Sequence, residues 1–362
     1  MKITGTLMAV CCVSAITAFS ATPMVKVTEK NIIRKEKTYT QKSWRVQFDH
    51  SAMILKNTVN SEGKLVTGTS DDYTFGLRHG TVNNGSWCSW SFMEVLDAQG
   101  KNLTRSSPVK DVTFIKFDGG SYADCVWEKG AIKVLQQQNM KNWVFVKAVV
   151  PSGIRQVSFK VWPGGTAWKV PGRERRLKIA DQDMELKGNT PKAIPFTGTE
   201  CGIAFYNRNY NDQYGNFLVF DPASVAKITG VEANSMTVRI IVKKDVKEMC
   251  FALGYFAKED PADATQRFLV ERLPNVKKTL DAINWNPAAD VSSFESTYKQ
   301  VQMLISAMEG PEKAEEEKKL KEIRDVFEQA KKSSDAAGCA KALDNLRAMQ
   351  KRVGSTKLNT LL

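Results

Sequence analysis

Between about Val25 and Lys258, apolar and polar residues alternate with a period of two in short runs. Trp44–Phe48 and Val144–Val149 are examples, and aromatic or β-branched residues fill many of the apolar positions. This pattern puts successive side chains on opposite faces of a strand. Turn residues such as Gln99–Gly100 separate the runs. About fourteen to sixteen short strands without interleaved helices favour a large antiparallel β-sandwich, which could take the form of one supersandwich or of two stacked smaller ones.

The pattern changes at Asp260, where an Asp-Pro pair is typical of a helix start. Apolar residues then recur at helical spacing in four stretches. These stretches are 260–283, 291–308, a third that begins at Pro311, and a fourth from about Ser334 to Gly354. Short connections between amphipathic helices predict a small antiparallel bundle or two helical hairpins, and residues 357–362 should fray. The expected fold class is therefore mostly β with an α-helical C-terminus.

The first residues of the chain have the pattern of a signal peptide. Lys2 precedes an apolar stretch over 7–18, and small residues follow up to Ala21. We therefore expect a signal peptide at 1–21, a β-sandwich domain at 22–258 and a helical domain at 259–362. No later segment has the roughly 20 apolar residues that cross a bilayer. The sequence predicts a periplasmic or secreted protein with no transmembrane segment after cleavage.

Residues 22–362 contain five cysteines, at positions 88, 125, 201, 250 and 339. An oxidising compartment would allow the pairs Cys88–Cys125 and Cys201–Cys250. Five free thiols are the favoured alternative, because a domain of this size does not need disulfides. No Cys-x-x-Cys spacing occurs and the chain has only 2 histidines. We therefore expect neither a metal site nor a cofactor.

The positive charge is concentrated in the predicted β region. The chain has 52 Lys and Arg against 39 Asp and Glu. Residues 259–362 hold 17 of each sign and Lys2 lies in the signal peptide, which leaves 34 bases and 22 acids, a net charge of +12, for 22–258. An excess of this size predicts attraction to a polyanion. The helical region is neutral overall and suits a structural or partner-docking role.

Aromatic residues are the first candidates for ligand contacts, because a flat ring can cover a sugar face while its polar group still forms hydrogen bonds. Trp87 and Trp90 lie in a polar turn before a strand, and Trp168 follows a Gly-rich turn. The segment 206–216 combines ring faces with amide and guanidinium groups between two strands, which suits sugar recognition. Its candidate carbohydrate-binding residues are Tyr206, Arg208, Tyr210 and Tyr214. The alternative is that these aromatics fill the core or fix the loop.

A basic segment over 169–178 supplies candidate anion-binding residues, namely Arg173, Arg175 and Arg176. Arginine binds sulfate or carboxylate with two parallel hydrogen bonds. The same residues could instead be the charged, solvated edge of a sheet. The acidic residues of 181–185 would share one face of a strand, most simply a solvated one.

Catalytic motifs are few. No nucleophile elbow, zinc-protease motif, phosphate-binding loop or dinucleotide fingerprint is present. The weak candidates are His79 or Tyr210 as a general base, with Arg208 or Arg78 neutralising a substrate carboxylate. The sequence thus leaves open whether the protein is an enzyme.

A large exported sandwich rich in aromatic residues resembles, in architecture, the carbohydrate-associated sandwiches, including the mutarotase-like supersandwich and the sandwich lyases. The favoured hypothesis is an exported protein that binds an anionic glycan without catalysis. One alternative is a polysaccharide lyase or glycoside hydrolase of the sandwich type. Another is an envelope assembly or scaffold protein that docks a partner through 259–362. Nucleic acid is disfavoured as a partner, because export separates the two and no nucleic-acid fold motif is visible.

Overall fold

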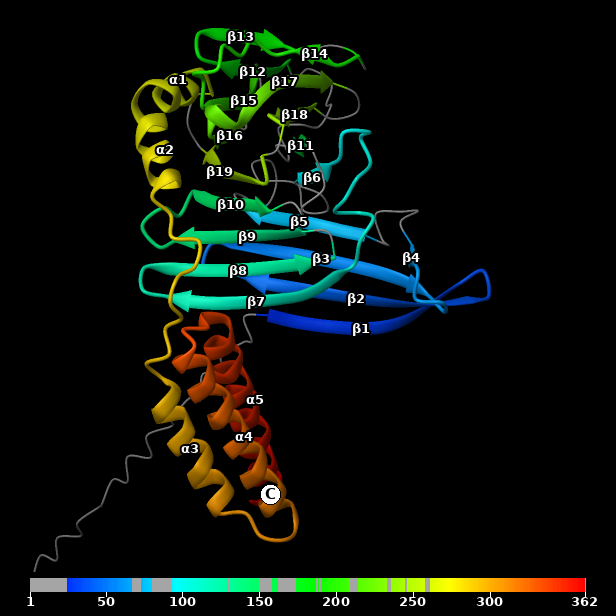
Figure 1. Cartoon of the computed structure of the whole chain (residues 1–362), viewed down its shortest axis with the longest axis vertical. Helices are drawn as coiled ribbons and strands as arrows, with labels where there is room; N and C mark the ends of the chain where they lie inside the picture. Colours follow the sequence, from blue (N-terminus) through cyan, green and yellow to red (C-terminus); the bar gives the residue numbers. More distant parts are fainter. Residues whose placement is uncertain are drawn as a thin grey trace, which may run out of the picture.

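The computed structural model confirms the fold class, with mostly antiparallel sheets followed by a helical C-terminus (Figure 1). It describes residues 25–66, 73–79, 93–128, 130–149, 158–161, 174–186, 188, 190–208, 214–232, 236–244, 246–257 and 261–361. The predicted signal peptide, Asp260 and Cys88 lie outside the described residues. Cys125, Cys201, Cys250 and Cys339 are free thiols, so the Cys201–Cys250 pair is not formed.

Nine antiparallel strands form the large sheet, in the order β13-β12-β15-β16-β19-β10-β9-β8-β7. Their bounds are β7 Val109–Phe117, β8 Gly120–Trp127, β9 Gly130–Gln137, β10 Trp143–Val149, β12 Glu174–Ile179, β13 Gln182–Glu185, β15 Gly202–Arg208, β16 Tyr214–Phe220 and β19 Glu248–Ala257. Strands distant in sequence, such as β10 and β19, are therefore neighbours in this sheet.

Two five-stranded sheets complete the β region. The first small sheet has the order β1-β2-β3-β4, and β5 also pairs with β3. The second has the order β14-β17-β18-β11-β6. Their bounds are β1 Val25–Arg34, β2 Lys37–Gln47, β3 Ser51–Asn60, β4 Leu65–Val66, β5 Tyr73–His79, β6 Met93–Leu96, β11 Ser158–Val161, β14 Lys192–Ala193, β17 Val225–Glu232 and β18 Met236–Val242. The 3-10 turn Pro222–Ser224 precedes β17.

The main core lies between the large sheet and the two small ones. Inward side chains of all three sheets form one cluster of buried apolar residues. Phe159 of β11 meets Phe251 of β19 edge-on, with ring centroids 5.1 Å apart, and Phe75 of β5 meets Trp127 of β8 at 6.0 Å. The architecture is therefore a sandwich with one large sheet in one layer and two small sheets in the other.

The opposite face of the large sheet is also buried, because the first helices of the C-terminal region cover it (Figure 1). These are α1 Pro261–Arg267, a π-helical segment Phe268–Arg272 and α2 Leu273–Asp281. The ring of Phe268 stacks on that of Phe217 in β16, with centroids 3.9 Å apart. Burial on both faces explains why β10 reads as a nearly continuous apolar run.

The remaining helices form a separate three-helix bundle with its own core. They are α3 Phe294–Ser306, α4 Glu312–Lys332 and α5 Ala336–Leu361. The Phe294 and Phe327 rings stack with centroids 3.6 Å apart, and Arg352 of α5 holds Glu316 of α4 through two hydrogen bonds of 2.5 and 2.6 Å. The sequence left open whether the four helical stretches form one antiparallel bundle or two helical hairpins. The structure instead puts the first one on the large sheet, because its apolar face matches that of β16 and β19.

The last helix also differs from its predicted end. It continues through Gly354 to Leu361, and so includes residues that were expected to fray. Gly354 has no close neighbour, since an added Cβ would lie 4.0 Å from the nearest heavy atom, in Leu304. A side chain at position 354 would therefore meet no close contact, and the glycine costs only helix propensity there.

Two glycine substitutions should have opposite effects on stability. A Cβ added at Gly215 would lie 2.7 Å from the Phe205 carbonyl oxygen and closer still to the Phe256 ring. We expect Gly215→Ala to lower the free energy of unfolding by about 1–3 kcal/mol through overpacking. Gly354→Ala should raise it by up to about 1 kcal/mol through helix propensity. Urea titrations of both variants test this, and equal effects of the two would contradict the described packing.

Candidate functional site

Several of the sequence-predicted site residues lie outside the described part of the chain. These are Trp87, Trp90, Trp168, Tyr210 and Arg173, together with the side chains of Arg208 and Tyr214. Their proposed roles stay predictions. The backbone of Arg208 ends β15 and that of Tyr214 begins β16, so the 209–213 segment connects two neighbouring strands of the large sheet, as the sequence indicated.

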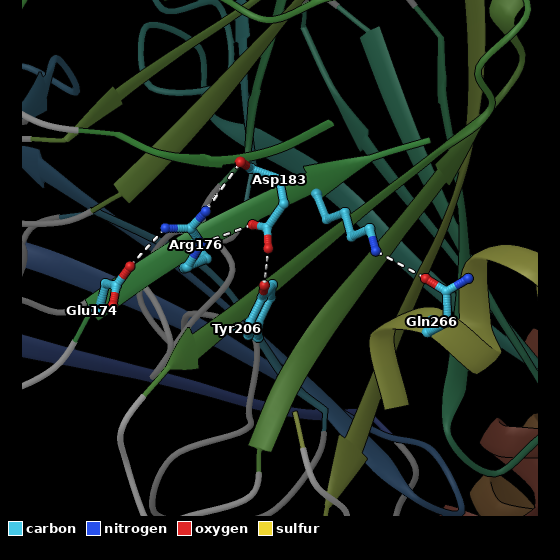
Figure 2. A network of polar contacts seen from close by, with 6 residues as sticks. Glu174, Arg176, Asp183, Tyr206 and Gln266 are labelled. Carbon is cyan, nitrogen blue, oxygen red and sulfur yellow. Dashed lines mark hydrogen bonds and ion pairs between the residues drawn. The ribbon is translucent and has the colours of Figure 1, made fainter. Parts of the chain in front are cut away.

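Arg176 lies inside a network of polar contacts rather than on an open edge (Figure 2). Its Nε donates to Asp183 Oδ1 at 2.8 Å, and its Nη1 donates to Glu174 Oε1 at 2.6 Å. Burial alone would lower the pKa of Arg176, but these two carboxylates outweigh it and raise the pKa above its usual range. The guanidinium charge is thus already matched by two carboxylates within the fold.

Tyr206 and Arg175 are also held in the interior. Tyr206 is only 3% exposed and its hydroxyl donates to Asp183 Oδ2 at 2.5 Å. Arg175 is equally buried on the other face of β12, and burial lowers its pKa. Neither of these two side chains offers an open surface to a ligand, which argues against the stacking role of Tyr206 and the anion-binding role of Arg175 that the sequence indicated. Arg176 is 14% exposed and already paired with two carboxylates, and its role in anion binding stays a prediction.

The acid run at 181–185 contributes to the same network. Asp183 was expected on a solvated strand face, but it accepts hydrogen bonds from both Arg176 and Tyr206. Next to this network, Lys178 Nζ donates to Gln266 Oε1 at 2.9 Å, which links β12 to α1 (Figure 2). The outward side of β12 and β13 therefore serves to hold the sheet edge and its covering helix.

His79 lies in a buried polar cluster between the first small sheet and the large sheet. Its side chain is 0% exposed and its ring meets Tyr255 edge-on at 5.1 Å. Within the described part of the chain neither ring nitrogen makes a hydrogen bond, and the same is true of Ser121 Oγ and Gln136 Nε2 nearby. Gln136 Oε1 accepts from the His50 backbone N–H at 3.0 Å.

The buried position determines what His79 can do. Burial is the main cause that lowers its pKa from 6.5 to about 4; the Asn142 backbone raises it in part, and the nearby His50 lowers it slightly. The imidazole is therefore neutral at pH 7, the form that a general base needs. However, a side chain with no exposed surface cannot contact a polysaccharide outside the sandwich, so access argues against this role.

A different surface gathers the positive charge that the sequence located in the β region. Trp44, Val46 and Leu55 point into the sandwich core, so the residues that alternate with them along β2 and β3 point outward. Seven outward positions of the first small sheet are basic. They are Lys26, Lys30 and Arg34 in β1, Lys37 and Arg45 in β2, Lys56 in β3 and Arg78 in β5. We call this surface the basic face.

Within the described strands the basic face carries no acidic residue. Strands β1 to β5 contain a single acid, Glu29, which stands opposite Lys42 on the face that points the other way. Lys26, Lys30, Lys37, Arg45 and Arg78 are exposed, and none of the five makes an ion pair within the described residues. The charges of these five side chains are thus not matched by an ion pair within the described part of the chain.

Like charges also stand directly opposite each other on the basic face. Lys26 pairs in register with Arg45, and Arg34 pairs with Lys37. Cβ atoms of such cross-strand pairs are about 5 Å apart, and like charges at that spacing destabilise a sheet. The fold tolerates two of these pairs within one hairpin, which is the pattern expected where the residues serve binding rather than stability.

Protection of a sheet edge can account for the bases that β1 and β5 contribute to the basic face, but not for those of β2 and β3. Edge strands often carry lysine to prevent pairing with another chain. Here Arg45 lies in β2 and Lys56 in β3, which are both flanked by other strands. Solubility does not account for it either, because solvated surfaces usually mix both signs of charge.

Metal binding and membrane spanning were also considered for the described residues. Among the described residues no three His, Cys, Asp or Glu side chains are grouped closely enough to bind a metal ion. Likewise, none of the described helices combines the length and apolar character needed to span a bilayer.

No protein-family model and no curated protein sequence matches the chain. Solved structures with a similar arrangement include a ligand-free α-N-acetylgalactosaminidase from Bifidobacterium bifidum, which is 9% identical over 62% of this chain and 38% of that chain, with a TM-score of 0.38. A heparan sulfate lyase from Pedobacter heparinus is 8% identical over 61% and 36%, with a TM-score of 0.30. A protein named as an aldose 1-epimerase from Klebsiella pneumoniae subsp. pneumoniae is 10% identical over 71% and 91%, with a TM-score of 0.33.

The chain therefore spans less than two fifths of the length of the galactosaminidase and of the lyase. All three neighbours carry the names of enzymes that act on carbohydrates. At these identities and TM-scores the similarity concerns only the general sheet architecture.

Proposed function

We propose that the protein binds an anionic polysaccharide through the basic face and does not catalyse a reaction on it. The observation that carries this proposal is the set of seven outward bases in β1, β2, β3 and β5 that share their face with no acid. Lysine and arginine side chains held by a rigid sheet form charge-assisted hydrogen bonds with sulfate or carboxylate groups. The net charge of +12 on residues 22–258 adds long-range attraction.

The sequence supports a polysaccharide rather than a nucleic acid as the polyanion. A signal peptide at 1–21 would deliver the chain to the periplasm or the exterior, where acidic glycans occur. The predicted aromatic contacts at Trp87, Trp90 and Trp168 would add sugar-ring stacking to the charge contacts. Both expectations stay predictions that support the proposal.

The composition of the basic face favours binding without chemistry. Its outward positions in β1, β2, β3 and β5 hold no carboxylate, imidazole or thiol, which are the usual groups of general acid–base and nucleophilic catalysis. A lyase or hydrolase role, or a role in assembly through 259–362, stays an alternative prediction.

Binding of dextran sulfate, with uncharged dextran as the matched control, tests the proposal. We expect the full chain to bind dextran sulfate and polygalacturonate at low salt, and the logarithm of the affinity to fall linearly with the logarithm of the salt concentration as counterions are released. Dextran should not bind. Affinity electrophoresis across a salt series measures both effects.

Two outcomes would contradict the proposal. The first is an absence of binding to every acidic polysaccharide at low salt. The second is tighter binding to single-stranded DNA or to phosphatidylserine vesicles than to the acidic polysaccharides, which would assign the basic face to another class of polyanion.

A further inference from the structure

We infer that a group of buried polar side chains at one end of the sandwich core is a binding site for uncharged hydroxyl groups. We call this group the internal polar cluster, and it consists of Ser51, His79, Ser121, Gln136 and Tyr255. The inference does not depend on the basic face, because the cluster lies on the inward side of the first small sheet. It assigns a ligand chemistry to buried groups that the proposed function leaves unused.

Both layers of the sandwich contribute to the internal polar cluster. Ser51 of β3 stands directly opposite His79 of β5 in the first small sheet. Ser121 of β8 stands opposite Gln136 of β9 in the large sheet. Gln136 Oε1 accepts hydrogen bonds from the His50 N–H at 3.0 Å and from Ser51 Oγ at 3.4 Å. These two bonds join the two sheets and bring the pairs together.

The side chains of these pairs point into the space between the sheets. His79 lies two residues after the core residue Leu77, and Gln136 lies two residues after the core residue Val134, so each shares the inward face of its strand. His79 and Ser121 are 0% exposed and Gln136 is 1% exposed. The cluster therefore lies at the edge of the apolar core and is closed off from bulk solvent.

Four atoms of the internal polar cluster have no hydrogen-bond partner within the described residues. They are both ring nitrogens of His79, Ser121 Oγ and Gln136 Nε2. The Asn142 backbone raises the pKa of His79, but it makes no hydrogen bond of normal geometry with the ring. Folded proteins pair nearly all buried polar atoms, because an unpaired atom loses its bonds to water without compensation. Four such atoms in one cluster point to a ligand that binds them together.

The donors and acceptors of the internal polar cluster match hydroxyl groups rather than ions. Gln136 Nε2 supplies N–H donors, and Ser121 Oγ can donate or accept. A neutral imidazole has one N–H and one acceptor nitrogen, and that acceptor needs a donor, which a backbone carbonyl cannot supply. None of these side chains is charged at neutral pH, so a buried ion would stay unneutralised. A hydroxyl group donates and accepts at once and so satisfies both kinds of atom.

Two sources can supply such hydroxyl groups, namely ordered water and a neutral sugar. Buried water molecules typically make two to four hydrogen bonds to polar groups that have no other partner. Exposed residues adjoin the cluster, since His50 and Asn142 are both exposed and the Tyr255 ring, which meets His79 edge-on at 5.1 Å, is only partly buried. A small ligand can therefore reach the cluster through a local opening at this end of the sandwich.

Replacement of Ser121 by alanine tests the inference through the sign of the stability change. If a hydroxyl group binds Ser121 Oγ, Ser121→Ala loses a hydrogen bond, and the unfolding equilibrium constant should rise about 2- to 10-fold. The matched control is Ser107→Ala, because Ser107 is 1% exposed and its Oγ donates to the Leu103 carbonyl at 2.9 Å. The control should raise the constant by a similar factor. Urea titrations of the full chain at pH 7 measure both changes.

A crystal structure of the full chain gives a second, direct measurement. We expect an ordered oxygen at about 2.7–3.2 Å from Ser121 Oγ, from Gln136 Nε2 and from the acceptor nitrogen of His79. This measurement does not depend on the folding of any variant.

Addition of glucose or galactose distinguishes the two sources, because neither sugar carries a charge that the basic face would attract. A saturable rise in the urea midpoint of the unaltered protein that Ser121→Ala abolishes would assign the site to a sugar hydroxyl. If the sugars have no effect, or if the rise persists in Ser121→Ala, the predicted loss of stability in that variant would assign the site to ordered water.

Two results would overturn the inference. One is an unfolding equilibrium constant that Ser121→Ala leaves unchanged or lowers, because removal of an unpaired hydroxyl stabilises a buried site. The other is a crystal structure with no ordered oxygen within about 3.5 Å of the four atoms. Neither result bears on the proposed function, which the binding of dextran sulfate tests separately.

Discussion

Replacing Lys37 and Arg45 together by glutamate should abolish polyanion binding and at the same time raise the stability of the fold. The double variant lowers the net charge of the basic face from +7 to +3. At about 1 kcal/mol per basic residue near an anionic surface, four charges correspond to about 4 kcal/mol, or on the order of a thousandfold in affinity. We expect a loss of at least about a hundredfold for long dextran sulfate at low salt.

The same substitutions convert both like-charge pairs into opposite-charge pairs. Lys37→Glu puts a carboxylate opposite Arg34, and Arg45→Glu puts one opposite Lys26. Cross-strand pairs of opposite charge stabilise a sheet by about 0.2–1 kcal/mol each, so the free energy of unfolding should rise by about 0.4–2 kcal/mol. A gain in stability with a loss of binding is what a surface selected for a ligand predicts.

The control is Lys318→Glu with Lys321→Glu on α4, which changes the net charge of the chain by the same amount. It should leave binding within about twofold, since long-range attraction alone is screened by salt over roughly 10 Å. If the two double variants weakened binding equally, the overall charge would be responsible and the basic face would lose its role. If the hairpin variant unfolded, the assignment of these residues to one outward face would be wrong.

Much of the fold could be predicted from the sequence because local patterns carry it. The alternation at Trp44–Phe48 and Val144–Val149 predicts strands, and both segments are strands for most of their length. The spacing after Asp260 predicts helices, and the described residues that follow form five α-helices. The pattern cannot show where an apolar helix face will pack. This is why the docking of Phe268 on Phe217 and the helix beyond Gly354 were not predicted.

The site residues were harder to predict because they depend on register. Whether Arg176 contacts solvent or Asp183 depends on the pairing of β12 with β13. That pairing forms only once the tight turn between the two strands has formed. The bases of β1 recur every four residues and are visible in the sequence. That Arg45 and Lys56 share their face follows only from the pairing of β1, β2 and β3, since a slip of one residue would turn either side chain inward.

Acid should destabilise the fold through His79 in particular. The pKa of this buried imidazole falls from 6.5 in the unfolded chain to about 4 in the folded one. The unfolded state therefore binds the proton more readily between these values. The contribution of the neutral imidazole to the free energy of unfolding is fully present above pH 6.5. It is lost as the pH falls toward 4, by about 3 kcal/mol in total.

His79→Phe should remove this dependence. The phenyl ring keeps the edge-on contact with Tyr255 and has no group that titrates. The free energies of unfolding of the two proteins, measured with urea at pH 4 to 8, should differ by a constant above pH 6.5 and diverge below it. At pH 4 the free energy of unfolding of the variant, minus that of the unaltered protein, should exceed the constant difference seen above pH 6.5 by about 3 kcal/mol.

The other groups near His79 set the controls for this measurement. His50 is exposed, and Asp49 forms an ion pair of 3.8 Å with Lys116. Both residues are kept unchanged in His79→Phe. The variant His50→Gln should keep the divergence between pH 6.5 and 4, because burial is the main cause of the lowered pKa of His79. Parallel curves for the unaltered protein and His79→Phe would show that the imidazole reaches solvent in the folded state. That result would restore His79 as a candidate base with access to a ligand.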